Sequence, residues 1–154
     1  HGFTATICAS VNEQVVHGIP NAETVLRDGD VISVDVGATY RGMVADAAVT
    51  IPVGTVKPEV LKLLEATEES LMAAIAQAVA GNHLEDVSGA VEDVNAKYGY
   101  GLVRNYGGHS VGYVLHEEPF IHNYRTGNPG PKLQPGNCLA IEPMFNLGGD
   151  GVYT

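Results

Sequence analysis

Alternating hydrophobic and polar residues mark two stretches in the first third of the chain. Residues 30–36, DVISVDV, and residues 43–51, MVADAAVTI, each repeat with a period of two, which is typical of β-strands. Residues 5–16, ATICASVNEQVV, predict a further strand, or a pair of strands with a turn at Asn12–Glu13. The next five residues, HGIPN, predict a loop, so this part of the chain is predicted to be β-structure.

The middle of the chain changes to a spacing that is typical of helices. Residues 58–80 predict a helix that begins at Pro58, a residue suited to a first helical turn, and that Gly81 ends. A second helix is predicted over residues 84–98, with Gly99 after its last residue. The expected buried stripes are Leu64, Leu71, Ile75 and Val79 in the first helix and Leu84, Val87, Val91 and Val94 in the second.

The last third is rich in glycine and predicts short strands and loops. PGPKLQPG, residues 129–136, is typical of a turn region, and NCLAIEPMF, residues 137–145, of a strand. No stretch has the composition of a linker, and 154 residues suffice for one domain with a hydrophobic core. Strands, two helices and further strands indicate a single α+β domain over residues 1–154.

Two segments resemble each other at an offset of 107 residues. Residues 26–35, LRDGDVISVD, and residues 133–142, LQPGNCLAIE, both contain a leucine, a turn with glycine, an apolar strand and an acidic residue. A His-x-x-Pro motif precedes each segment, as HGIP at 17–20 and HEEP at 116–119. The shared order indicates two copies of one β-unit related by a pseudo-twofold. A site between two such halves would bring two histidines and two acidic residues together.

Composition and charge narrow the classes of function. The formal net charge is −10, so a partner with a phosphate backbone is not expected. No apolar run approaches the ~20 residues of a membrane span, and the first residues, HGFTATICAS, lack the basic start of a signal peptide. Cys8 and Cys138 lie among apolar neighbours, and we expect buried free thiols in a reducing compartment rather than a disulfide.

Asp35 and Asp46 lie on the two strands of the predicted hairpin. A turn centred on Tyr40–Arg41 would place the two aspartates directly opposite each other. Opposed like charges on a sheet repel and raise one another's pKa, whereas a divalent cation between them removes the repulsion. A solvent-exposed pair is the alternative, and the small residues on the same face favour the cation.

Glu142 and His109 are further candidate ligands. Glu142 ends an apolar strand, where a carboxylate needs a partner, either a cation or one of Arg41 and Arg104. His109 lies in GGHSVG, whose glycines allow close approach of a ligand, and a structural histidine is the alternative. Carboxylates with one imidazole suit manganese, iron, cobalt or zinc, and a carboxylate can bridge two such ions.

His17 and His116 begin the two His-x-x-Pro motifs of the repeat. Neutral imidazoles beside a metal can donate a hydrogen bond to a developing oxyanion or orient a substrate carbonyl. The alternative is that both histidines are structural and pack against Pro20 and Pro119. Their equivalent placement favours a shared role at one site.

The chain contains, in order, SVNEQVVHGIP, GDVISVDVG, VADAAVT, GGHSVGYVLHEEP and PGNCLAIEPM. Together these segments resemble type I methionine aminopeptidases, which share the pita-bread fold with proline-directed dipeptidases and creatinase. The resemblance spans essentially all 154 residues, and the combination of GHSVG, HEEP and IEPM is far more specific than any one motif. It implies an α+β fold with a curved antiparallel sheet, helices on the outer face and two pseudo-symmetric halves.

The resemblance implies a two-metal site that holds cobalt, manganese, iron or zinc. The implied ligands are Asp35, Asp46, His109 and Glu142, with Asp46 bridging the ions. His116 would stabilise the tetrahedral intermediate, His17 would help to hold the substrate, and Glu142 would belong to the catalytic group. The implied methionine pocket is lined by Phe3, Cys8 and Leu115, with His17 and His116 beside it.

The implied reaction is hydrolysis of the first peptide bond, which removes N-terminal methionine from nascent polypeptides whose second residue is small. The implied setting is cytoplasmic, with a monomer that meets nascent chains and the ribosome. The family has a further glutamate ligand near a His-Thr pair, which would lie beyond Thr154. We therefore expect a fragment of a metallopeptidase domain that lacks the N-terminal helices and the final C-terminal strands.

Two other functions stay open at this point. A proline-directed aminopeptidase or dipeptidase has the same fold, and a peptide panel would distinguish it from a methionine aminopeptidase. An inactive pita-bread module that binds peptides or proteins would be expected to lose metal ligands. The four ligands in this chain favour an enzyme.

Overall fold

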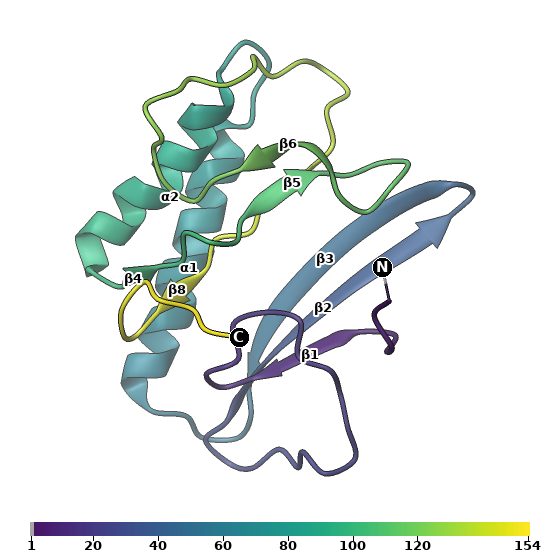
Figure 1. Cartoon of the computed structure of the whole chain (residues 1–154). Helices are drawn as coiled ribbons and strands as arrows, with labels where there is room; N and C mark the ends of the chain where they lie inside the picture. The colour runs from purple at the N-terminus through teal and green to yellow at the C-terminus, as the bar shows by residue number, and fades with distance from the viewer. Residues whose placement is uncertain (1) are drawn as a thin grey trace.

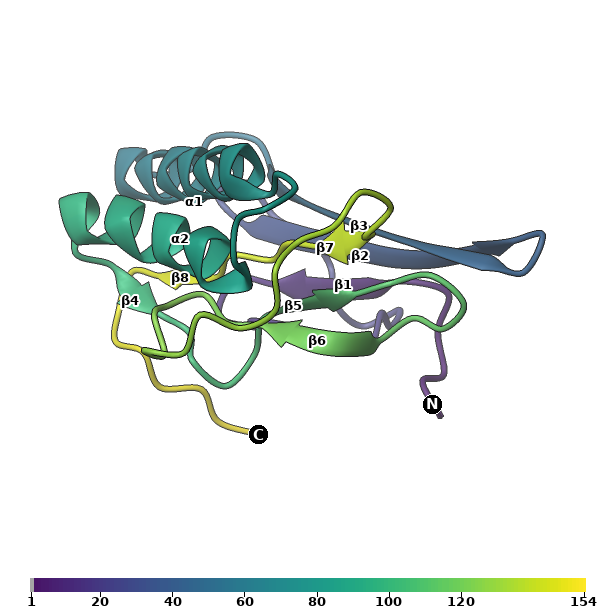
Figure 2. The ribbon, with the colours of Figure 1, turned by 90° about the horizontal axis from the view of Figure 1, so that it is seen from above.

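A layer of two helices faces a layer of short strands in the computed structural model of the chain, which describes residues 2–154 (Figure 1). The helices are α1 (Pro58–Gln77) and α2 (Leu84–Tyr98). Seen from above, they lie side by side on one face and the short strands lie on the other (Figure 2). The predicted α+β class is confirmed. Neither helix has the length and apolarity that a membrane crossing would require, within residues 2–154.

The strands form three antiparallel sheets. The first contains β1 (Cys8–Val11), β2 (Val31–Tyr40) and β3 (Met43–Pro52), in that order. The second pairs β4 (Gly101–Leu102) with β8 (Phe145–Asn146). In the third, β5 (Gly108–Ser110) lies between β6 (Glu117–Ile121) and β7 (Leu139–Ala140). The N–H of Val44 in β3 donates to the carbonyl of Gly112 at 2.7 Å, which ties the first sheet to the segment after β5.

The β2–β3 hairpin has a different register from the predicted one. Its turn is centred on Arg41–Gly42, both with positive φ, so Asp35 pairs with Ala48 and Asp46 with Gly37. The prediction that the two aspartates face each other directly is wrong by two residues, because the glycine fixes where the chain can reverse. Side-chain direction repeats every two residues, so both aspartates still project from one face.

Helix α2 confirms the prediction in its bounds and in its buried face. His83 and Asp86 form a capping box at its start, where the His83 N–H donates to Asp86 Oδ2 at 2.7 Å. Gly99 ends it with φ 72°, a left-handed conformation that suits glycine. The predicted stripe of Leu84, Val87, Val91 and Val94 is buried.

Helix α1 departs from the prediction at its end and on its buried face. It ends at Gln77, before Gly81, and Ile75 and Val79 of the predicted stripe are 46% and 49% exposed. The buried residues are instead Ala66, Ser70 and Ala74. Small residues every four positions let two helices approach closely, so packing against α2 selected this face over the larger apolar side chains.

The core lies between the two helices and the short strands. Its buried members are Ala66, Ala74, Leu84, Val87, Val91, Leu102, Ile121, Leu133 and Phe145. They come from α1, α2, β4, β6, β8 and the turn before β7. The β2–β3 hairpin contributes none of them and extends away from the helices (Figure 1).

The predicted strand over residues 137–145 is wrong in its extent. Only Leu139–Ala140 and Phe145–Asn146 are paired, and the residues between them leave the ladder. Pro143 has no N–H and restricts the residue before it, so it interrupts the strand at Glu142. Cys138 is exposed, contrary to the prediction, because it follows a surface turn; both cysteines are free.

The predicted repeat has matching turns. In residues 27–30 and in residues 134–137, the fourth N–H donates to the first carbonyl, at 3.1 Å in both. The side chain of the fourth residue also accepts the first N–H, at 2.7 Å for Asp30 and 2.8 Å for Asn137. The sequence similarity at this offset therefore corresponds to one turn conformation used twice.

Candidate metal centre

His109 lies at the middle of the candidate site. It is on β5, the central strand of its sheet, and is 6% exposed. Its Nδ1 lies 3.0 Å from the carbonyl oxygen of Ser110, which can only accept a hydrogen bond. When the ring is neutral, its proton is therefore on Nδ1, and Nε2 presents a lone pair.

Two carboxylates face that lone pair. His109 Nε2 lies 3.0 Å from Glu142 Oε1 and 3.4 Å from Asp46 Oδ2. The three ligand atoms lie within 4.8 Å of one another. Contacts this short between a ring nitrogen and two carboxylates need a proton or a metal cation between them, and a carbonyl on the far ring nitrogen is typical of metal-binding histidines. This donor set fits a divalent transition metal.

Asp46 and Asp35 place two negative charges beside each other. The Asp46 side chain is 12% exposed. Burial raises its pKa, and the Asp35 carboxyl beside it raises the pKa further. The two aspartates were expected to face each other across the ladder. The observed register places them on a diagonal instead, on the same face of the sheet.

Glu142 completes the group from the other half of the chain. Burial raises its pKa to about 7, and the charges of Asp46 and Asp35 act in the same direction, while His109 opposes them. A carboxyl that holds its proton near neutral pH exchanges it readily for a metal ion. Metal binding at this carboxyl therefore displaces a proton at and below about pH 7.

His116 lies directly against the central histidine. The ring centroids of His109 and His116 are 4.3 Å apart. His116 is exposed overall, but partial desolvation of its ring lowers its pKa and the neighbouring His109 lowers it further, which favours the neutral imidazole at pH 7. Glu117 shapes the preceding loop, since its Oε1 accepts the N–H groups of Tyr113 at 2.7 Å and Val114 at 3.0 Å.

His17 is held in a strained backbone conformation. Its φ is 59°, a left-handed value that non-glycine residues rarely adopt. Two hydrogen bonds fix the next residue: Gly18 N–H donates to Ser10 Oγ at 3.0 Å, and its carbonyl accepts the Ala9 N–H at 2.8 Å. The His17 ring packs edge-on against Tyr106, with centroids 6.1 Å apart.

Two of the three predicted pocket residues border the aspartates. Cys8 pairs with Asp35 across the β1–β2 ladder, and burial followed by the charge of Asp35 raises the pKa of its thiol. Leu115 packs over Gly37, the ladder partner of Asp46: its Cδ1 lies 3.0 Å from the position of an added Cβ. Phe3 lies before β1 and is 40% exposed, the most accessible of the three.

The sequence comparisons indicate a metallopeptidase family. The model of metallopeptidase family M24 matches residues 1–154. The chain belongs to family M24. Methionine aminopeptidase 1 of Bacillus subtilis is 47% identical to this M24 chain over 154 residues, which cover 100% of the chain and 62% of the relative.

Solved structures show the same fold. The methionine aminopeptidase of Thermotoga maritima matches with a TM-score of 0.90 and 44% identity, over 96% of the M24 chain and 59% of that structure. A prolidase from Pyrococcus horikoshii matches with a TM-score of 0.78 and 25% identity, over 92% and 40%. These neighbours have the pita-bread fold, which confirms the predicted fold class. The M24 chain spans about 60% of the length of its methionine aminopeptidase relatives.

Several residues that support the site gave no signal in the sequence. Ser10, Glu117 and Asn123 hold the segments that carry His17, His116 and Glu142. Each makes a single type of contact with the backbone, and although Glu117 lies in the HEEP motif, the motif does not indicate that contact. Asp150, near the end of the chain, accepts the Leu102 N–H at 2.9 Å and pairs with Arg104.

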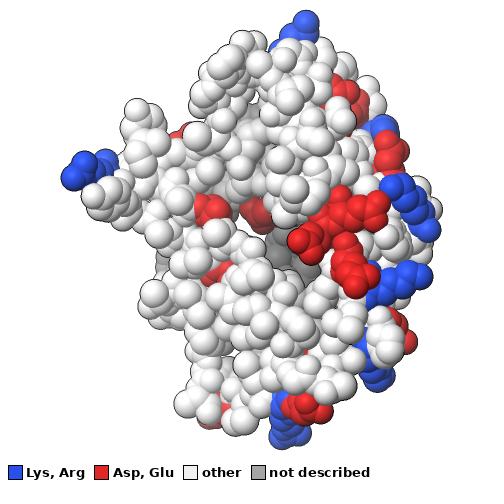
Figure 3. Space-filling model, turned by 180° about the vertical axis from the view of Figure 1, so that it is seen from behind, with Lys and Arg blue, Asp and Glu red and all other residues white. Residues whose placement is uncertain are grey.

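Charge on the back of the M24 chain is unevenly distributed. Asp and Glu side chains gather near a hollow in the middle of this face, and Lys and Arg side chains lie toward its edge (Figure 3). With a formal net charge of −10, the surroundings attract cations rather than phosphate groups.

Proposed function

We propose that this M24 chain carries the catalytic residues of a metal-dependent aminopeptidase that removes N-terminal methionine. The observation that carries the proposal is the convergence of Asp46, His109 and Glu142, whose ligand atoms lie within 4.8 Å of one another. Similarity to proteins named methionine aminopeptidase, at 44–47% identity, supports methionine as the released residue. Residues 1–154 would form a single catalytic domain.

Two divalent ions would occupy the site. Asp35 and Asp46 would bind one ion, His109 and Glu142 the other, and Asp46 would be shared. Cobalt, manganese, iron and zinc suit these donors. When bound, such ions polarise a peptide carbonyl and activate water. The pKa of Glu142, about 7, supports an exchange of proton for metal at neutral pH.

The two histidines of the His-x-x-Pro motifs would act on the substrate. His116 is neutral at pH 7 because its pKa is lowered, so it can donate a hydrogen bond to a developing oxyanion. His17 would hold the peptide from the opposite half, where its ring packs edge-on against Tyr106. Glu142 would contribute to catalysis through the negative charge it places beside the reacting group.

The substrate would be a nascent polypeptide with a small second residue. Phe3, Cys8 and Leu115 would line the pocket for the methionine side chain, and the packing of Leu115 over Gly37 supports an apolar wall there. The setting would be the cytoplasm, where a monomer meets nascent chains at the ribosome. No contact with nucleic acid or membrane is proposed.

Metal content and peptide release together test the proposal. The 154-residue chain is loaded with Mn(II) or Co(II), bound ions are counted by elemental analysis, and release of the first residue is followed on Met-Ala-Ser and on Ala-Pro. We expect bound metal with at least one weakened position, because a further glutamate ligand is expected beyond Thr154, and release from Met-Ala-Ser rather than Ala-Pro where these residues suffice for turnover. The variant His109→Ala serves as the control that removes a ligand.

Each other outcome has a distinct meaning. Release from Ala-Pro alone would favour a proline-directed enzyme, which the structural similarity to a prolidase supports as a second candidate. Ions bound without release would mean that residues outside these 154 are needed for turnover, or that the protein is a binding module. No bound ions would overturn the metal site.

A further inference from the structure

Glu142 lies outside the β-ladder of its own strand. Strand β7 ends at Ala140, and pairing resumes only with β8 at Phe145. A carboxylate on such a segment is not fixed by regular strand pairing. Its oxygen nevertheless has to stay 3.0 Å from His109 Nε2 for the donor set to form. Another group must therefore fix the backbone at this position.

Asn123 makes that contact. Its side chain is 1% exposed, and its Nδ2 donates to the carbonyl oxygen of Glu142 at 2.9 Å. The topology brings the two residues together: β6 and β7 flank β5, and both run antiparallel to it, so both chains continue past the same end of β5.

Two glycines at that end make the approach possible. A methyl group on Gly107 would collide with the carbonyl of Ile121, and one on Gly108 with the carbonyl of Ala140. The backbones of β6 and β7 thus lie closer to β5 than any side chain there would allow. The short amide of Asn123 can then span the remaining gap to Glu142.

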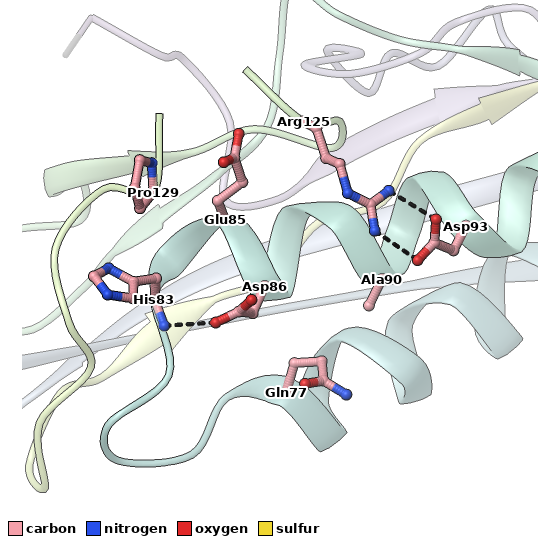
Figure 4. A pocket seen from close by; sticks show the side chains of 8 residues that line it. All are labelled: Gln77, His83, Glu85, Asp86, Ala90, Asp93, Arg125 and Pro129. Carbon is pink, nitrogen blue, oxygen red and sulfur yellow. Dashed lines mark hydrogen bonds and ion pairs between the residues drawn. The ribbon is translucent and has the colours of Figure 1, made fainter. Parts of the chain in front are cut away.

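The segment that follows Asn123 is anchored to α2. The N–H of Arg125 donates to Glu92 Oε2 at 3.1 Å, and its guanidinium makes two 2.7 Å bonds to Asp93. Figure 4 shows this pair at the edge of a pocket of about 400 Å³ beside α2. Glu85 in the same pocket accepts the N–H groups of Thr126 and Gly127. Hydrogen bonds to α2 therefore fix the segment that directly follows Asn123.

We propose that Asn123 is a positioning residue for the metal centre: its amide fixes the Glu142 backbone and thereby the ligand oxygen beside His109. The inference rests on the proposed metal site. Outer contacts that orient metal ligands typically change metal affinity by about 10- to 100-fold when they are removed. Without the Asn123 amide, the segment around Glu142 gains freedom, and the ligand oxygen no longer has one fixed location.

The chain offers a matched control in Asn95. Its Nδ2 donates to the carbonyl of Tyr100, also at 2.9 Å, at the end of α2 and outside the donor set. Asn123→Ala and Asn95→Ala each remove one amide-to-carbonyl hydrogen bond. We expect both variants to have a lower urea midpoint in the metal-free state. Only Asn123→Ala should weaken Mn(II) binding, by about tenfold or more in calorimetry.

A spectroscopic readout separates positioning from general stability. The visible absorption bands of bound Co(II) should shift in Asn123→Ala and stay unchanged in Asn95→Ala, because the bands report ligand geometry. If Asn123→Ala does not fold, Asn123→Leu, which keeps the volume and removes the donor, must show the same loss beside Asn95→Leu.

The outcomes distinguish this inference from the proposed function. If the wild type binds Mn(II), and Asn123→Ala binds it with the same affinity and gives the same Co(II) bands, the positioning role is overturned and the metal site is left intact. Equal losses of affinity in the Asn123 and Asn95 variants would also overturn it, since the effect would then be one of stability. No metal bound by the wild type would overturn both.

Discussion

Asp35 in the first half and Glu142 in the second follow the same turn at the same distance along the repeat. Asp35 lies inside the ten-residue strand β2, with Cys8 paired on one side and Ala48 on the other. Glu142 lies two residues beyond β7, and the Asn123 side chain binds its carbonyl. One repeat unit therefore holds its carboxylate in a strand ladder, and in the other a buried amide binds the backbone of the carboxylate residue.

The two halves also differ in packing. In the second half, Val91 and Ile121 are each 1% exposed, and the short strands lie against the helices. In the first half, Val49 of β3 is 56% exposed and the hairpin contributes nothing to the core cluster. The aspartates of the first half therefore lie in a long ladder outside the core cluster, whereas Glu142 lies on an irregular segment beside the packed layer.

Removal of one ligand from either half is the largest test of a shared site. Asp46→Ala and His109→Ala should each weaken Mn(II) binding by more than about a hundredfold, because loss of a ligand exceeds the effect of an outer contact. His122→Ala is the control, since that ring packs between Phe120 and Tyr124. Calorimetry gives the affinities. If Asp46→Ala binds Mn(II) as tightly as the wild type, the ion is held by residues of the second half alone.

The pH dependence of Mn(II) affinity tests the raised pKa of Glu142. Its pKa of about 7 means that a proton competes with the metal below neutral pH, so Mn(II) affinity should rise by up to about tenfold per pH unit until pH 7 and then level off. The raised pKa of Asp46 acts in the same direction. In Glu142→Gln the rise should become shallower, and an unchanged slope would contradict the assignment.

The raised pKa of Glu142 has the opposite pH effect on the stability of the metal-free protein: stability falls as the pH rises. The folded state holds the Glu142 proton more tightly than the unfolded chain, so this contribution to stability is complete below pH 4.5 and is lost as the pH rises to about 7. Urea unfolding of the metal-free wild type and of Glu142→Gln at pH 5 and pH 7.5 measures it. We expect the wild type to lose more stability than the variant between these pH values.

Matched valine substitutions test the difference in packing. Val91→Ala creates a cavity beneath the helices and should lower the free energy of unfolding by about 2 kcal/mol. Val49→Ala changes a half-exposed position on β3 and should lower it by about 0.5 kcal/mol or less. Urea midpoints of both variants give the comparison. Equal losses would show that the hairpin depends on packing as much as α2 does.

The smallest test concerns the feature that the halves share. Gly29 and Gly136 have φ values of 96° and 95° at equivalent places in the two turns. An added Cβ meets nothing closer than 3.7 Å at either position, so Gly29→Ala and Gly136→Ala introduce backbone strain without a clash. Each should destabilise by about 1 kcal/mol. A difference in urea midpoint between the two would show that the turns are not equivalent.

The sequence predicted α2 to the residue, because its spacing, its capping residues and its terminal glycine all agree. It failed for the buried face of α1, where large apolar residues competed with Ala66, Ser70 and Ala74. It failed again between residues 137 and 145, where an apolar run looked like a strand. Periodicity gives the type of an element, but the neighbour that packs against it decides which face is buried.

By itself, the sequence determined the class of elements, the repeat and the set of carboxylates and histidines that can bind a metal. Tertiary structure alone decided that Asp46 and Glu142 meet at His109, because the Val44 to Gly112 hydrogen bond and the β5–β7 pairing join segments far apart in the chain. It also decided that Asn123 reaches Glu142. A local pattern fixes the direction of a side chain along its own strand, whereas distances between strands arise only when the core closes.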